Sequence, residues 1–310
     1  MKSIGITLGD PAGVGPEILV KSLPFLAEQK CFFLLFGDEN LLKREAKHYN
    51  VFLPSNLKII NLSELKVQPG KPTPESQLAT LRYLEEAIRY ALSGELKALV
   101  TLPINKEVFK LAGLPFRGHT EYLAHTLGAK APAMSFYGRR LRVTLITTHL
   151  PLRDVFSKLE VSKIVEIAQL AYDFTKRLNP RKRELKIALS ALNPHAGEGG
   201  LLGDEEERLL KPAIKIAQDQ GIPLYGPYPA DSLFFFASRG YFDHVLSLYH
   251  DQGLIPFKLF HFRDGVNVTL GLPIVRTSPV HGTAYDIAGQ GKAFPDSFIS
   301  AVKLALRLSK

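Results

Sequence analysis

Three histidines stand directly after short apolar segments that we expect to be buried strands: His149, His195 and His250. The carboxyl ends of parallel strands meet at one edge of a sheet, so these imidazoles can converge there. One such histidine alone is more often structural, but three in equivalent places favour a shared role. Neutral imidazoles that leave open coordination positions suit a catalytic divalent metal, and we predict such a site.

Two aspartates are candidates for proton transfer. Asp251 follows His250 and could serve as a metal ligand, as a base or as the partner that orients the imidazole. Asp231 precedes an apolar helical segment, where capping the helix is the alternative role. The residues alone do not choose among these roles.

Two further groups of side chains are candidate ligands of a polar substrate. His119 and Thr120 could bind it through imidazole and hydroxyl, although Thr120 could instead cap the helix that follows. Lys258, Asn267 and Arg276 lie within a short stretch, and two cations with an amide suit a phosphate or carboxylate. His119 and Lys258 are also candidates for proton transfer.

Two glycine-containing segments could hold a cofactor. Residues 281–294 include Gly282 and Gly289, which admit a ligand close to the backbone, and Asp286, which could accept from a ribose or adenine group. Residues 9–17 carry three glycines at a strand end, but their spacing differs from the dinucleotide fingerprint. A plain turn is the alternative interpretation of either segment.

The elements that must position these residues alternate between short apolar runs and amphipathic stretches. We expect strands at residues 4–8, 31–36, 57–60, 98–102, 143–147, 185–191 and 245–248. Helical periodicity is present at residues 78–91, 164–174 and 296–308. Strands that alternate with helices predict an α/β fold with a parallel sheet covered on both faces. Residues 134–137 and 141–147 read as a hairpin.

Composition limits the classes of protein that fit. The chain has 310 residues with a formal charge of +9, and its cations are scattered among 30 acidic residues, densest at Arg139-Arg140 and Arg181-Lys182-Arg183. Neither cluster has interleaved aromatics, so we expect a solvated basic surface and no nucleic-acid partner. No apolar run approaches the length of a membrane span. The single cysteine, Cys31, favours a reducing compartment, and we expect a cytoplasmic protein with Cys31 buried.

Several segments together resemble the 4-hydroxythreonine-4-phosphate dehydrogenase family: residues 9–17, 101–106, 118–121, 193–200, 249–253 and 271–273. They run in order along nearly the whole chain, and the segments around His195 and His250 are highly specific. Residues 281–292 also resemble the adenine-side cofactor loop of isocitrate and isopropylmalate dehydrogenases, which bind NAD(P) without the usual fingerprint.

The resemblance implies two α/β/α domains with a cleft between them. Residues 1–115 with 265–310 would form the cofactor-side domain, and residues 116–264 the metal, substrate and dimer-interface domain. It implies a homodimer with a shared active site. It implies metal ligands His149, His195 and His250, and substrate contacts His119, Thr120, Lys258, Asn267 and Arg276.

The implied reaction is NAD- or NADP-dependent oxidation of 4-phosphooxy-L-threonine to a 3-keto acid, which loses carbon dioxide to give 3-amino-2-oxopropyl phosphate in pyridoxine 5′-phosphate synthesis. Imidazole ligands suit zinc or cobalt, while phosphorylated substrates are often bound together with magnesium. One alternative is a sister dehydrogenase of a four-carbon sugar-acid phosphate such as 4-phosphothreonate. Another is a phosphate acyltransferase on a related fold, which the three histidines disfavour.

Overall fold

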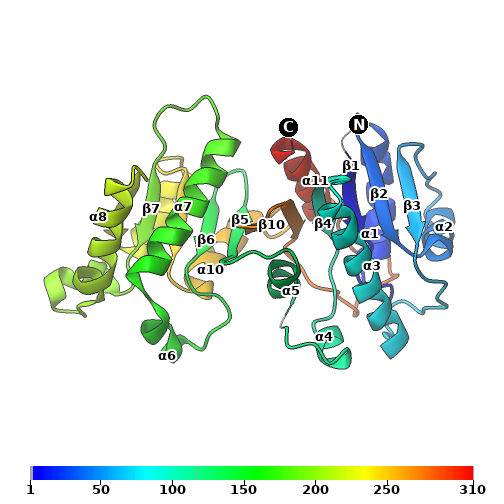
Figure 1. The fold of residues 1–310 in the computed structure, drawn as a ribbon, viewed down its shortest axis with the longest axis horizontal. Helices are drawn as coiled ribbons and strands as arrows, with labels where there is room; N and C mark the ends of the chain where they lie inside the picture. The colour runs from blue at the N-terminus through cyan, green and yellow to red at the C-terminus, as the bar shows by residue number, and fades with distance from the viewer. Residues whose placement is uncertain (1–2, 117, 310) are drawn as a thin grey trace. The chain divides into compact units, whose positions relative to one another are not determined.

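The computed structural model describes residues 3–116 and 118–309. The chain divides into two compact units, one formed by Met1–Pro132 with Arg263–Lys310 and the other by Ala133–Phe262. The first unit is therefore built from both ends of the chain (Figure 1). Residues 116–132 lie in this first unit, whereas the division drawn from the sequence placed them in the second.

The first unit contains a mixed sheet in the order β3-β2-β1-β4-β11-β10. All neighbours pair in parallel except β10 and β11, which are antiparallel. Its strands are β1 (Ser3–Thr7), β2 (Phe32–Gly37), β3 (Leu57–Asn61), β4 (Leu96–Thr101), β10 (Val266–Leu270) and β11 (Val275–Pro279). Its helices are α1 (Gly15–Ala27), α2 (Glu39–His48), α3 (Pro74–Leu92), α4 (Glu107–Leu111), α5 (His119–Thr126) and α11 (Asp296–Leu308).

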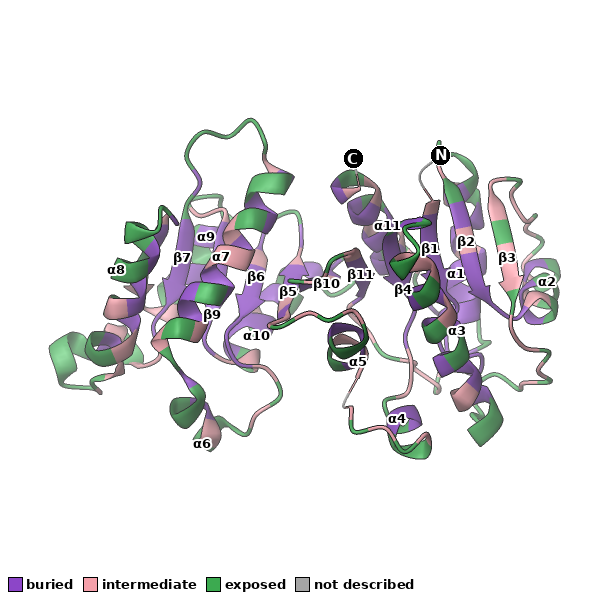
Figure 2. Cartoon of the chain, viewed as in Figure 1, coloured by how far each residue is buried: buried purple, intermediate pink, exposed green. Residues whose placement is uncertain are grey.

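The central strands of this unit are apolar over most of their length and are buried on both faces there. Residues 4–7 and 98–101 are buried throughout (Figure 2). Strands of a parallel sheet that is covered on both sides are apolar at successive positions. This explains why the sequence showed continuous apolar runs there and no alternation of apolar and polar residues. Helices α3 and α11 both pack on β4, and α1 packs on α2 and α11.

The second unit contains strands in the order β5-β6-β9-β7-β8. Strands β6, β9, β7 and β8 are parallel, and β5 is antiparallel to β6. Its strands are β5 (Ala133–Tyr137), β6 (Arg142–Leu145), β7 (Ile187–Ser190), β8 (Leu224–Tyr228) and β9 (His244–Ser247). Its helical segments are α6 (Leu152–Val155), η1 (Phe156–Lys158), α7 (Val161–Leu178), η2 (Pro194–Gly200), η3 (Glu206–Leu210), α8 (Lys211–Asp219), α9 (Ala230–Ser238) and α10 (His250–His261).

The structure confirms the predicted α/β class and the hairpin, in which Phe136 pairs with Val143. Apart from that hairpin the sheet was predicted to be parallel, and this was wrong for β10, which runs antiparallel to β11. Strands β8, β10 and β11 were not expected. Cys31 is half-buried and lies just before β2, so its predicted burial was also wrong. Among the residues described, no helix is both long and apolar enough to cross a membrane.

Candidate active site

Three loops of the first unit meet at one edge of its sheet. Strands β1, β4 and β11 are parallel neighbours, so the segments that follow them lie at the same edge. These segments are residues 8–14, 102–106 and 280–295. Such an edge is where open α/β sheets bind their ligands.

The first of these loops holds the last one in place. The Tyr285 hydroxyl donates to the Asp10 carboxylate at 2.5 Å, and the Val14 N–H donates to the Thr283 carbonyl at 2.9 Å. A Cβ at Gly13 would stand 3.0 Å from the Thr283 oxygen, so glycine allows this close approach. Residues 9–17 therefore hold the backbone of the segment 281–294, which the sequence predicted as a cofactor loop, in its position.

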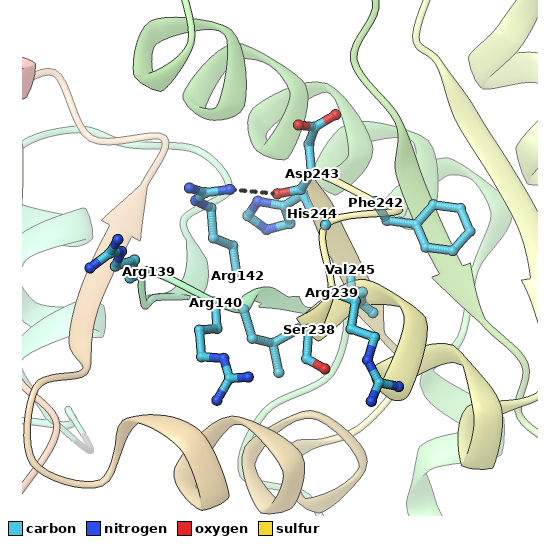
Figure 3. Close-up of a pocket in the computed structure, with 12 residues that line it drawn as sticks. Arg139, Arg140, Arg142, Ser238, Arg239, Phe242, Asp243, His244 and Val245 are labelled. Carbon is cyan, nitrogen blue, oxygen red and sulfur yellow. Dashed lines mark hydrogen bonds between the residues drawn. The ribbon is translucent and has the colours of Figure 1, made fainter.

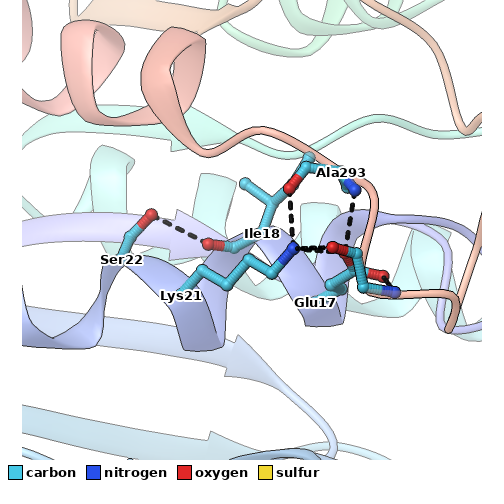
Figure 4. Close-up of polar contacts among 6 residues, drawn as sticks. Glu17, Ile18, Lys21, Ser22 and Ala293 are labelled. Atoms are coloured by element: carbon cyan, nitrogen blue, oxygen red, sulfur yellow. Dashed lines mark hydrogen bonds and ion pairs between the residues drawn. The ribbon is translucent and has the colours of Figure 1, made fainter. Parts of the chain in front are cut away.

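Glu17 and Lys21 of α1 fasten the far end of the same loop (Figure 4). The buried Glu17 carboxylate accepts from the N–H groups of Ala293 at 2.9 Å and Gly291 at 3.3 Å. Lys21 Nζ donates to Glu17 at 2.7 Å and to the carbonyls of Gly291 and Ala293 at 2.8 and 2.9 Å. Charge-assisted bonds of this kind fix a backbone firmly.

The predicted cofactor residues lie on the exposed side of this loop. Gly289 needs its glycine for packing, because its φ is +72° and a Cβ would stand 2.6 Å from Pro69. Gly282 faces open space, so no group of the described chain occupies the room beside it. Asp286 is exposed, which leaves its carboxylate accessible to a sugar hydroxyl.

His119 is the first residue of α5 and is half-buried. Its Nε2 has no hydrogen-bond partner among the described residues. Burial, then the charges of Arg276 and Lys106, hold the pKa of His119 well below its usual range. The imidazole is therefore neutral at physiological pH and offers an unpaired ring nitrogen.

Arg276 and Asn267 present polar groups on one face of the β10–β11 pair. Arg276 lies opposite Thr269 in the antiparallel register, and Asn267 is two residues from Thr269, so all three side chains share a face. Arg276 is only 2% exposed, and its guanidinium donates to the hydroxyls of Thr269 and Thr101 at 3.1 and 2.6 Å. Its Nε and the Asn267 Oδ1 are buried without partners among the described residues.

The burial of Arg276 has an electrostatic consequence. Desolvation lowers its pKa to about 10, so the guanidinium stays charged at neutral pH. None of the described carboxylates lies within ion-pair distance of it. A buried, unpaired cation is costly unless an anion joins it. The group formed by His119, Asn267 and Arg276 is therefore suited to a phosphate or carboxylate.

Lys106 belongs to this electrostatic environment and was missed as a functional residue. It follows β4 at the N-cap of α4, and its charge contributes to lowering the pKa of His119. The only signal in the sequence was its place within residues 101–106. Thr120 lies within the first turn of α5, and Gly118 stands at the N-cap, so a capping role for Thr120 was wrong.

The second unit carries the three predicted metal ligands at one edge of its sheet. Strands β6, β9 and β7 are parallel neighbours, and His149, His250 and His195 follow them in that order. The rings of His149 and His250 are adjacent, with centroids 5.6 Å apart. They line a cavity of about 240 Å³ together with Asp251.

The Asp251 carboxylate orients the His250 imidazole. Its oxygen lies 2.7 Å from Nδ1, so Nδ1–H donates to it and Nε2 keeps a free lone pair. Carboxylates play this role beside many metal-binding histidines. The donor chemistry of His149 and His250 thus fits a divalent metal.

His195 lies apart from this pair. In the described part of the chain, no three metal-binding side chains form one group, so the predicted histidine triad is not assembled within a single chain. The backbone around His195 is unusual, because His195, Ala196 and Glu198 have left-handed φ values of 53°, 56° and 45°. The Glu206 carboxylate stabilises the loop by accepting from the N–H groups of Leu192 and Asn193, both at 2.8 Å.

Asp231 and Lys258 are both exposed in the second unit. Asp231 lies in the first turn of α9 and accepts from the Ser232 N–H at 2.9 Å, while Pro229 stands at the N-cap. A capping role for Asp231 was therefore wrong. Lys258 lies on α10 and belongs to a different unit from Asn267 and Arg276.

The fold identifies the general class to which the chain belongs. Isocitrate dehydrogenase from Methylococcus capsulatus matches with a TM-score of 0.53 at 16% identity, over 99% of this chain and 85% of that one. This likeness shows a shared fold, and it confirms the isocitrate dehydrogenase-like architecture expected from the sequence.

The family follows from closer matches. The model of the pyridoxal phosphate biosynthetic protein PdxA matches residues 29–305, and the chain belongs to that family. It is 43% identical to a 4-hydroxythreonine-4-phosphate dehydrogenase from Desulforapulum autotrophicum, over 97% of this chain and 94% of that protein. It is 40% identical to a D-threonate 4-phosphate dehydrogenase from Salmonella typhimurium, over 99% of both. The crystal structure of a 4-hydroxythreonine-4-phosphate dehydrogenase from Klebsiella pneumoniae matches with a TM-score of 0.86 at 37% identity, over 99% of this chain and 98% of that one. The resemblance seen in the sequence is thereby confirmed.

Proposed function

We propose that this dehydrogenase oxidises 4-phosphooxy-L-threonine with NAD or NADP, and that the 3-keto acid formed decarboxylates to 3-amino-2-oxopropyl phosphate. The observation that carries the proposal is the buried Arg276 guanidinium, which has no carboxylate partner among the described residues and lies near the unpaired Nε2 of His119. This group suits an anionic substrate, and relatives at 40–43% identity are named for phosphorylated hydroxy acids.

Arg276, Asn267, His119 and Thr120 would bind the anionic end of the substrate. Arg276 supplies charge, Asn267 an amide and His119 a neutral ring nitrogen. A pKa well below its usual range makes His119 a weak base, so we assign it to substrate binding and not to proton removal. Asp231, Asp251 and Lys258 then stay as candidates for the base. Lys258 would also contact the substrate.

Residues 281–294 would hold the nicotinamide cofactor. Asp286 would accept from a sugar hydroxyl, Gly282 would let the backbone approach the ligand, and Gly289 would give the loop its turn beside Pro69. Hydride would pass from the substrate carbon that bears the hydroxyl to the nicotinamide ring, and the hydroxyl proton would go to the base.

His149, His195 and His250 would hold a divalent metal such as zinc, cobalt or magnesium. A bound cation of this kind lowers the pKa of a hydroxyl and stabilises negative charge on its oxygen. The His149–His250 pair and the bond from His250 to Asp251 support the assignment.

A homodimer would complete the site, because His195 does not join the other two histidines within one chain. Helix α10 supports association through an apolar stripe at helical spacing. Ile255, Leu259 and Phe262 are 63%, 79% and 73% exposed. Exposed apolar side chains that share one side of a helix fit a surface that another chain covers. We further propose that the enzyme acts in the cytoplasm, where a reducing environment suits a lone cysteine.

The experiment is to follow absorbance at the nicotinamide band while the protein, NAD or NADP, a divalent metal and 4-phosphooxy-L-threonine are mixed. We expect reduced cofactor to form, and a chelator to stop its formation. A second candidate substrate is D-threonate 4-phosphate, favoured by the relative named for it. No reduced cofactor with either compound would refute the proposed function.

A further inference from the structure

The second unit contains a cavity of about 280 Å³ that is rich in arginine (Figure 3). Arg139, Arg140 and Arg142 reach it from the β5–β6 hairpin and the start of β6, and Arg239 reaches it from the end of α9. In the view of Figure 3, Arg140 and Arg239 extend in the same direction on either side of Ser238. The cavity thus brings together cations that are about a hundred residues apart in sequence.

The positive charge of this cavity is not neutralised by the described residues around it. None of the four arginines has a described carboxylate within ion-pair distance. The one carboxylate on the wall, Asp243, already accepts from Lys182 Nζ at 2.6 Å and from the Lys186 N–H at 2.8 Å.

The arginine side chains are held by contacts that leave some of their guanidinium N–H groups without a partner among the described residues. Arg142 donates to the Asp243 carbonyl at 3.2 Å, but its Nε is buried without a partner among the described residues. Arg239 stacks on Phe235 with the guanidinium carbon 3.5 Å from the ring centroid, and Arg140 lies over Phe260 at 5.0 Å. Stacking orders a guanidinium while its N–H groups still point outward.

The cavity lies at the opposite end of the strands from the histidines. Arg142 and His244 begin β6 and β9, whereas His149 and His250 follow the carboxyl ends of the same parallel strands. Strand β6 alone, with a rise of about 3.3 Å per residue, separates the two ends by roughly 10 Å. The cavity is therefore distinct from the proposed metal site.

We propose that this cavity is a second anion-binding site, which takes a small phosphate-bearing molecule. Guanidinium forks match phosphate oxygens in bidentate fashion, and Arg140 and Arg239, which extend in the same direction, would supply two such forks to one phosphate. The volume is at the low end for ligand pockets, which favours a phosphomonoester or free phosphate over a larger ligand. The aromatic ring of Phe242 and the hydroxyl of Ser238 line the same hollow and could contact an organic portion.

The test is a calorimetric titration of the full-length protein with inorganic phosphate and with glycerol 3-phosphate. It is made in the Arg276→Met background, which removes the anion contact assigned to the active site. Arg140→Ala/Arg239→Ala added to that background should weaken phosphate binding at least tenfold. Arg181→Ala/Arg183→Ala is the matched control, because it removes two exposed arginines of the same unit and the same charge.

The outcomes separate local binding from a general effect of charge. Equal phosphate affinity in the two sets of variants, whether both are weakened or both unchanged, would overturn the proposal. A loss confined to Arg140→Ala/Arg239→Ala, with an unchanged thermal midpoint and oligomeric state, would support it. Tighter binding of glycerol 3-phosphate would identify an organic phosphomonoester as the ligand, and equal binding would identify free phosphate. Since binding is the readout, the test does not depend on whether the proposed reaction is correct.

Discussion

Lys21 Nζ lies 2.7 Å from the Glu17 carboxylate, and this ion pair spans the base of the loop at residues 281–294. Both side chains bind the backbone of the loop at Gly291 and Ala293. The pair would therefore act on the proposed cofactor site through the shape of the loop.

Lys21→Met should raise the KM for NAD(P) about tenfold, which corresponds to about 1.4 kcal/mol. Lysine donates to two loop carbonyls that methionine cannot bond, so the loop would be less ordered before the cofactor binds. We expect kcat to change less than twofold. Steady-state kinetics with varied cofactor provides the measurement.

Lys43→Met is the control for that variant. Lys43 pairs with Glu39 at the same helical spacing and the same 2.7 Å, but both side chains are well exposed on α2. Exposed pairs contribute little to stability, so the cofactor KM should not move. An equal effect of the two substitutions would show that Lys21 has no special role.

Arg276→Met should reduce kcat/KM for the phosphorylated substrate by two to three orders of magnitude, because a charge-assisted contact contributes on the order of 3 kcal/mol. Stability should not fall, since an unpaired buried cation is replaced by an apolar side chain of similar length. Kinetics and thermal unfolding together test this. A variant that unfolds readily yet turns over normally would assign Arg276 to the core alone.

Asp251→Asn should lower the affinity for the divalent metal by ten- to a hundredfold, because the Nδ1–H of His250 would lose its carboxylate partner.

His195→Ala should abolish turnover while the protein stays folded. Metal binding to the two variants can be measured by calorimetry, with circular dichroism as the check on folding. Full activity of His195→Ala at saturating metal would remove it from the metal site.

His244 should make the protein more sensitive to acid. Burial, and then Arg142, lower the pKa of this residue to about 3. In the unfolded chain this histidine is protonated below about pH 6.5, whereas in the folded chain it stays neutral. The free energy of unfolding therefore falls as the pH drops below that value. Between pH 7 and pH 5 the loss from this group is about 2 kcal/mol.

His244→Gln should lack that component. Its acid-induced loss of stability between pH 7 and pH 5 should be smaller than that of the wild type by about the same amount, as measured by urea unfolding at each pH. Identical pH profiles would show that the His244 proton is not linked to folding.

The convergence of loops at each sheet edge was predictable from the sequence. Parallel strands place all their carboxyl ends on one side, and the segments after the strands at residues 4–8 and 98–102 carried recognisable motifs. The same reasoning put His149 and His250 at one edge, and the structure places their rings side by side.

Other features depended on tertiary structure. The left-handed turn at His195 is stabilised by Glu206 from beyond the loop, and no local pattern reveals that partnership. Residues 266–270 alternate apolar and polar side chains, which is a strand signal, but the burial of Arg276 requires the partner strand to be known. A role for Lys106 near Arg276 could be inferred only from the structure, in which β4 pairs with β11.

The most direct test of the central claim compares 4-phosphooxy-L-threonine with D-threonate 4-phosphate in parallel assays of reduced cofactor, with carbon dioxide release measured in each. The proposed function predicts a kcat/KM at least tenfold higher for 4-phosphooxy-L-threonine, with one carbon dioxide released per reduced cofactor. A preference for D-threonate 4-phosphate would contradict the substrate assignment, and reduction without carbon dioxide would contradict the reaction.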